Sequence, residues 1–105
     1  MASITMKKIT VTVATAGVPV QVSTSQIFTT QIEVFGNAQN TGGSYLGGSD
    51  VDSGWIPIAA NEVKAYTASE NAAMASGDYF DLSKIWVDAA TAANVLVVQY
   101  YAREE

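Results

Sequence analysis

The chain contains no cysteine and no histidine in its 105 residues. The absence of cysteine excludes a disulfide framework, a zinc knuckle and thiol chemistry, so stability has to come from packing or assembly. The absence of histidine removes the side chain most often used to move protons near neutral pH. These absences favour a packing and binding module over an enzyme, and we predict no catalytic residue, no cofactor and no metal ligand.

Charge is also scarce, since only 14% of the residues are charged while 49% are hydrophobic. The net charge is −5, and among the five basic residues only Lys7 and Lys8 are adjacent. Nucleic acids and anionic membranes are bound through clusters of lysine and arginine. We therefore expect no nucleic-acid partner and no membrane partner. A weakly charged surface suits contact with other proteins, although a plain domain with a bland surface has the same composition.

Long apolar runs are absent as well. Residues 1–8 carry their lysines after the apolar residues, so they resemble neither a signal peptide nor a membrane span. We expect synthesis in the cytoplasm of a host cell. The chain is long enough for one domain. We assign that domain to residues 1–105, with 1–8 as a candidate N-terminal arm.

The chain instead has short runs in which apolar residues alternate with polar ones. Alternation at period two is typical of half-buried strands, and here turn residues interrupt it about every ten positions. About seven or eight strands are expected, which favours an antiparallel sandwich or a small barrel. The clearest runs are 8–15, 27–35, 63–67, 82–89 and 95–102.

Individual residues refine this prediction. Pro19 places the run 18–22 at a sheet edge, because proline cannot donate to a strand ladder. In the run 27–35, Phe28 is expected among the core anchors. The run 95–101 is apolar on both faces and is expected to be central, and residues 103–105 are expected to form a solvated tail.

The segment 69–76 departs from the strand pattern. Thr67 and Glu70 have the spacing of a capping box, so we expect at most one short helical turn here, with a loose loop as the alternative. Tyr79 and Phe80 follow directly, and adjacent aromatic residues in a loop point in different directions. We predict a partner contact at Met74, Tyr79 and Phe80.

Two further groups of residues are candidates for ligand binding. Asp50 and Asp52 precede a glycine as in many calcium loops, but the twelfth position holds Asn61 instead of glutamate. A turn that uses aspartate for local hydrogen bonds is the alternative. Aromatic residues such as Trp55 and Trp86 would stack on a sugar in a lectin-like module, although their strand positions favour a core or interface role.

Several motifs occur in a suggestive order. They are Tyr45-Leu46-Gly47-Gly48-Ser49, Ile56-Pro57-Ile58 followed by Glu62, Asp81-Leu82-Ser83-Lys84-Ile85-Trp86-Val87-Asp88-Ala89, and a closing strand that ends in tyrosine. Their order is similar to that of small virion proteins of tailed bacteriophages and prophages. The chain departs from that pattern at Asn61, where glycine is usual, at Trp86, where tyrosine is common, and in a longer segment 69–80.

The resemblance implies a jelly-roll-like β-sandwich that decorates or cements the outer surface of a phage head. Its partners would be the major capsid protein and further copies of the chain, as a homotrimer in preference to a homodimer. A module that binds only the assembled lattice stabilises it by mass action, by about 2.7 kcal/mol per site at a hundredfold excess over Kd. The alternatives are a tail, neck or fibre component, or a glycan-binding β-sandwich. We expect Trp86→Ala to collapse the fold and Tyr79→Ala to weaken assembly only.

Overall fold

The computed structural model describes residues 3–52, 55–68, 75–76 and 79–104. Met74 and most of the segment for which a helical turn was predicted lie outside these residues. The described part contains β-strands and one 3-10 helix. The strands are β1 (Ser3–Thr12), β2 (Val20–Gln21), β3 (Phe28–Thr29), β4 (Gln31–Gly36), β5 (Ser44–Gly47), β6 (Ile56–Ile58), β7 (Val63–Thr67), β8 (Ala75–Ser76), β9 (Tyr79–Asp81), β10 (Trp86–Ala89) and β11 (Val95–Glu104), and the 3-10 helix is η2 (Leu82–Lys84).

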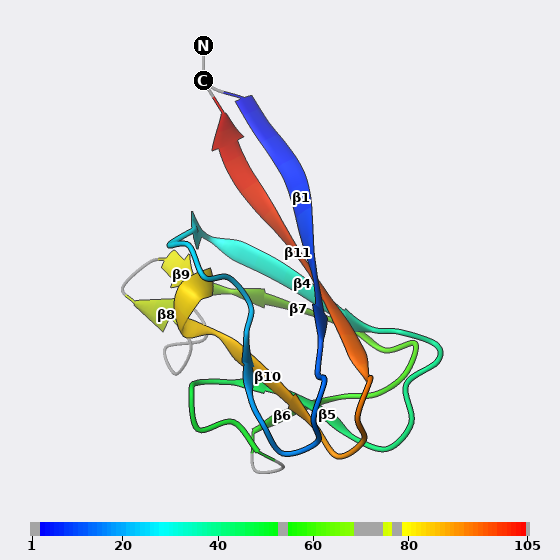
Figure 1. Cartoon of the computed structure of the whole chain (residues 1–105). Helices are drawn as coiled ribbons and strands as arrows, with labels where there is room; N and C mark the ends of the chain where they lie inside the picture. The colour runs from blue at the N-terminus through cyan, green and yellow to red at the C-terminus, as the bar shows by residue number, and fades with distance from the viewer. Residues whose placement is uncertain (1–2, 53–54, 69–74, 77–78, 105) are drawn as a thin grey trace.

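Two four-stranded sheets form the body of the molecule (Figure 1). Sheet A has the order β1-β11-β4-β7, and sheet B has the order β2-β10-β5-β6. When these eight strands are numbered along the chain, the orders become 1-8-3-6 and 2-7-4-5. This is the strand order of a jelly roll, in which two Greek keys are wrapped together. The predicted all-β, antiparallel, jelly-roll-like sandwich is therefore confirmed.

The core lies between the inner faces of sheets A and B. Along β4, Ile32 and Val34 point inward, while Gln31, Glu33 and Phe35 point outward, as the alternation in the sequence requires. Burial of each large aliphatic side chain contributes about 1.5–3 kcal/mol. The buried cluster that joins the sheets includes Val11, Val13, Ile32, Val34, Leu96, Val98 and Tyr100 from one side and Leu46, Ile58, Val87 and Ala89 from the other.

A small third sheet, sheet C, has the order β3-β9-β8. Together with η2 it contributes Phe80, Leu82 and Ile85 to the same core. Sheet C and η2 therefore form part of the sandwich and not a separate unit.

Three boundary predictions were wrong. The run 27–35 is divided at Thr30 into β3 and β4. The run 82–89 begins with η2 and becomes a strand only at Trp86, because Asp81 caps the 3-10 turn. The N-terminal arm and the C-terminal tail are both strands, because Ser3 pairs with Glu104 and the ladder continues from there into the sandwich.

Other positional predictions are confirmed. β11 lies between β1 and β4, which explains why its sequence is apolar on both faces. Pro19 directly precedes β2, which is an edge strand of sheet B. Across the described ranges, no helix combines the length and apolar character needed to cross a bilayer.

Candidate interaction surfaces

The structure separates the two aromatic residues predicted to contact a partner. The Tyr79 side chain is 51% exposed, whereas Phe80 is fully buried in the core. Phe80 lies opposite Thr29, which is also buried, so these two face inward from sheet C. Tyr79 is thus left as the surface residue of the pair.

Sequence reasoning missed the neighbour of Tyr79. Phe28 was expected in the core, but its side chain is exposed. It lies opposite Asp81, and alternation along β9 puts Tyr79 on that same side, diagonal to Phe28. The break at Thr30 resets the alternation, so that Thr29 is the inward residue instead. Phe28 and Tyr79 form an exposed aromatic pair, which we call the sheet C pair.

Beneath the sheet C pair, Asp81 is only 2% exposed. Its Oδ1 accepts hydrogen bonds from the Ser83 backbone N–H (3.0 Å) and hydroxyl (2.7 Å), and its Oδ2 accepts one from Gln26 Nε2 (3.1 Å). Burial raises the pKa of Asp81, but these hydrogen bonds and the positive charge of Lys84 outweigh burial and lower the pKa below its ordinary value. A carboxylate with its oxygens occupied in this way caps η2 and is poorly placed for acid–base chemistry.

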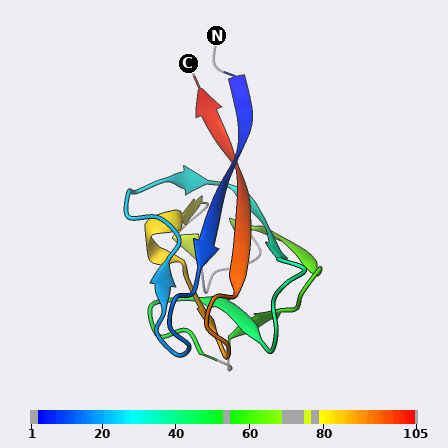
Figure 2. The same cartoon turned by 45° about the vertical axis from the view of Figure 1, so that its right-hand side comes forward.

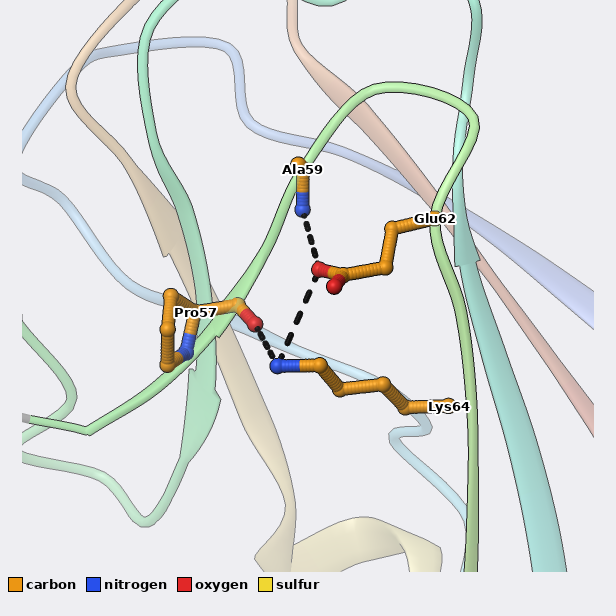
Figure 3. Close-up of polar contacts among 4 residues, drawn as sticks. All are labelled: Pro57, Ala59, Glu62 and Lys64. Carbon is orange, nitrogen blue, oxygen red and sulfur yellow. Dashed lines mark hydrogen bonds and ion pairs between the residues drawn. The ribbon is translucent and has the colours of Figure 1, made fainter.

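The corner between β6 and β7 contains the second motif of the resemblance (Figure 3). Glu62 Oε1 accepts a hydrogen bond from the Ala59 backbone N–H at 2.9 Å. Lys64 Nζ donates to the Pro57 carbonyl at 2.6 Å and lies 3.7 Å from Glu62 Oε1. Burial, with a smaller contribution from the charge of Glu62, raises the pKa of nearby Tyr66. Lys64 thereby links an edge of sheet A to an edge of sheet B, so this motif acts structurally.

The turn of this corner also explains one departure from the virion-protein pattern. Asn61 has a φ of 63°, in the left-handed region that glycine and asparagine adopt most easily. Its N–H donates to the Gly36 carbonyl at 3.0 Å. Gly36 itself has to be glycine, because a Cβ there would clash with the Ala59 carbonyl. Asparagine is therefore a physically conservative replacement for the usual glycine.

A two-stranded ribbon extends beyond the sandwich (Figures 1 and 2). Residues 3–6 of β1 pair with residues 101–104 of β11, whereas the pairing of β4 with β11 ends at Tyr100. The Thr29 hydroxyl donates to the Tyr101 carbonyl at 2.9 Å and fixes the base of the ribbon. The ribbon makes the molecule elongated, with extents of 44 × 24 × 22 Å. Ser3 and Glu104 lie at its tip.

The outer face of sheet A is nearly uncharged. Register and alternation identify its outward side chains, and of those that the structure describes only Lys8 and Glu33 are charged. Val97 is 8% exposed although it lies outside the core cluster, because neighbours on this face surround it. The face consists of Met6, Lys8, Thr10, Thr12, Gln31, Glu33, Phe35, Val63, Ala65, Thr67, Val95, Val97, Gln99 and Tyr101.

The outer face of sheet B carries two tryptophans. Trp86 lies directly opposite Gly47 and points away from the core, since the next residue, Val87, is in the core. The Trp55 ring occupies the space that a side chain at Gly47 would fill. Trp86 is partly buried on this outer face and outside the core cluster, so its truncation would remove surface packing and not core packing.

Asp50 and Asp52 lie on an exposed turn closed by the Val51 N–H and the Gly48 carbonyl (3.0 Å). Within the described ranges, no three acidic, histidine or cysteine residues are grouped to hold a metal ion.

Comparison of the chain with protein-family models and with curated proteins gives no match. The likeness to phage virion proteins therefore depends on the residues quoted above.

Proposed function

We propose that the protein is a structural virion protein of the decoration or cement type, which binds the outer head of a tailed phage and stabilises the lattice of its major capsid protein. The observation that carries this proposal is the ribbon. Residues 3–6 and 101–104 form strands that pair with each other beyond the end of β4 (Figure 2). The base of this ribbon is held to the sandwich by the Thr29–Tyr101 hydrogen bond and by Ala102, which packs against the core. An isolated pair of strands is marginally stable in water.

The ribbon is suited to strand addition. Along residues 3–6, one side of β1 pairs with β11, and no described strand pairs with its other side. On β11, the Tyr101 carbonyl accepts a hydrogen bond from the Thr29 hydroxyl, and beyond it no described strand pairs with the second side of residues 102–104. Extended segments of a partner bind such edges through main-chain hydrogen bonds. A capsid subunit that supplies a strand would complete the ribbon as a small sheet.

The fold and the composition are consistent with this role. Jelly rolls recur in viral capsid proteins, although they also occur in lectins and enzymes, so the fold by itself does not decide the function. A chain that is only 14% charged loses little hydration when it is pressed against a neighbouring protein. The same proposal includes three further steps: the chain is made in the host cytoplasm, it associates with further copies of itself, and it assembles onto the head.

The experiment is to add the purified chain to undecorated heads of its own phage. We expect saturable binding and a raised melting temperature of the heads. Thr5→Pro should break the ribbon pairing with Ala102 and abolish binding, while Thr5→Val keeps the strand and should bind as the wild type does. Both variants should retain a folded sandwich, as circular dichroism would show. Absence of wild-type binding to heads would refute the proposal, and binding to tails instead would assign the chain to a tail, neck or fibre structure.

A second candidate, a glycan-binding module, is favoured by the two tryptophans on the outer face of sheet B. Aromatic rings at the surface bind sugars by stacking on their apolar faces. The Trp55 ring fills the space over Gly47, and Trp86 lies directly opposite Gly47 on the neighbouring strand. Binding to a glycan array that is lost in Trp86→Ala, together with no binding to heads, would favour this candidate.

A further inference from the structure

We infer that the outer face of sheet A is a self-association surface, on which a second copy of the chain packs face to face about a two-fold axis that runs along β11. The inference gives a partner to the proposed shell component, as a dimer in place of the homotrimer that the resemblance implies, and so its biological use rests on that proposed function. The dimer itself is measured without heads, so the two proposals can fail separately.

Charge complementarity identifies a second copy as the partner. Lys8, Gln99 and Glu33 form one row across β1, β11 and β4. The two charges are opposite in sign and lie one strand away from Gln99 on either side. A two-fold axis along β11 therefore places Lys8 over Glu33 of the second copy, and Glu33 over Lys8 of the second copy. Neither residue forms an ion pair with another described residue.

The rows on either side of this one are apolar where they meet the axis. Val97 lies between Thr10 and Phe35, so the axis brings Val97 onto Val97 of the second copy. In the row on the other side of Gln99, Tyr101 lies opposite Met6. The axis likewise places Tyr101 onto Tyr101 of the second copy. An isologous interface requires a surface that is complementary to itself in this manner. The charged row thus lies between two rows that meet the axis at Val97, which is 8% exposed, and at Tyr101.

Self-pairing through the free edge of β1 is disfavoured by contrast. β1 spans Ser3–Thr12, and Lys7 and Lys8 are its two central residues. Antiparallel pairing of two β1 edges with full overlap puts Lys7 directly opposite Lys8 of the other copy. Like charges at directly opposite positions destabilise a strand pair, and edge lysines are a common defence against such pairing. A second copy is therefore expected to bind the outer face of sheet A and not the free edge of β1, which can pair with a strand of a different partner.

The size of the face sets the expected affinity. With strands about 4.8 Å apart and outward rows about 6.8 Å apart, the three overlapping strands cover on the order of 400 Å². A standard interface buries about 800 Å² per partner. We therefore expect a weak, reversible dimer that forms at protein concentrations on the order of tens of micromolar.

Charge reversal tests the pairing. Sedimentation equilibrium of the wild type should show a dimer, with twice the 11.0 kDa mass of the chain. Lys8→Glu and Glu33→Lys each turn two attractive contacts into repulsive ones and should raise the dimer dissociation constant about tenfold or more. The double variant Lys8→Glu/Glu33→Lys should restore dimerisation. Lys84→Glu and Asp50→Lys, which make the same charge changes at exposed positions away from this face, should leave it unchanged.

Crosslinking tests the axis independently. Because the chain has no cysteine, Gln99→Cys introduces a single thiol on the axis. A bis-maleimide with a spacer of about 10 Å, the usual separation of stacked sheets, should join two such chains efficiently. The matched control Ala65→Cys lies on the same face but two strands away from β11, on β7. The axis places the two copies of this residue about 19 Å apart across the strands and about 10 Å apart between the sheets, which is about 22 Å in all, so they should not be joined.

A monomer at millimolar concentration, a trimer mass, or a double variant that stays monomeric would each overturn this inference. Equal crosslinking of Gln99→Cys and Ala65→Cys would overturn it as well. A dimer that does not bind heads would leave the inference intact and refute the proposed function. Head binding by a chain that stays monomeric would support the proposed function and refute the inference.

Discussion

At the scale of single residues, the motif side chains that carry the virion resemblance hold turns together. Asp81 caps η2 through Ser83, and Glu62 holds the Ala59 N–H in the corner before β7. Asp88 Oδ1 accepts from the Ala89 N–H at 2.7 Å at the end of β10. Because each of these carboxylates is used by nearby backbone, these motifs specify the path of the chain between strands. Partner recognition is then left to the faces and edges of the sheets.

The Asp81 network makes a prediction about stability and pH. Asp81→Asn replaces the acceptor for Gln26 Nε2 with a second donor, and we expect a loss of about 1–3 kcal/mol in the free energy of unfolding at pH 7. The folded-state pKa of Asp81 is lowered, so its stabilisation is complete above the ordinary aspartate pKa of about 3.9 and is lost as the pH falls through the folded value. Urea titrations between pH 2 and pH 7 measure this, with the exposed Asp50→Asn as the control. A gap between Asp81→Asn and wild type that stays constant down to pH 2 would contradict it.

At the scale of elements, β9 shows how a short strand divides adjacent aromatic residues between core and surface. Phe80→Ala should cost about 3–5 kcal/mol, because it empties a fully buried site. Tyr79→Ala, one residue away, should change the free energy of unfolding by less than about 1 kcal/mol, because that side chain is half exposed. Thermal and urea unfolding of the two variants measure this contrast. Similar losses in both would mean that the register of β9 against β3 is different.

Alternation at period two predicted the elements whose inner face is apolar throughout. The part of β1 with Ile9 and Val11 and the central part of β11 were predicted from this pattern. β7 was predicted as well, although Lys64 lies on its inward side, and the edge position of β2 was predicted from Pro19. Two strand ends were missed, because residues 3–7 and 103–104 have mixed sequences. Residues 3–7 become a strand by pairing with residues 100–104 of β11. The division at Thr30 and the 3-10 turn at Asp81 were missed for a related reason, since side-chain hydrogen bonds override the local strand pattern there.

The interaction surfaces were less accessible to sequence reasoning. Tyr79 was predicted, but its neighbour Phe28 was assigned to the core. The row of Lys8, Gln99 and Glu33 unites residues that are far apart in the chain, and only the register of three strands places them side by side. A single sequence contains no signal for that register beyond the alternation itself. The weak overall charge was the one sequence feature that indicated a protein-binding exterior.

At the scale of the whole molecule, the proposed dimer through the outer face of sheet A determines how the ribbons of the two copies are oriented. A two-fold axis parallel to β11 preserves the direction of every strand that runs along it. Figure 1 shows the ribbon of one copy projecting beyond its sandwich. In the proposed dimer the two ribbons therefore project toward the same side. Two ribbons on one side allow both to engage the same shell, and linked binding sites of this kind raise the apparent affinity by about 10²–10⁴-fold when both can be occupied.

This geometry predicts that dimerisation and head binding are coupled. Lys8→Glu and Glu33→Lys should each weaken binding to undecorated heads by about a hundredfold, because each ribbon then binds alone. The double variant should recover wild-type affinity, although its surface carries both reversals, since the two ion pairs re-form across the axis. Titration of heads with labelled protein measures these affinities, and the half-maximal concentration is compared among the four proteins. If the single reversals bind heads as tightly as the wild type, each chain binds the shell by itself, and the two ribbons do not act together.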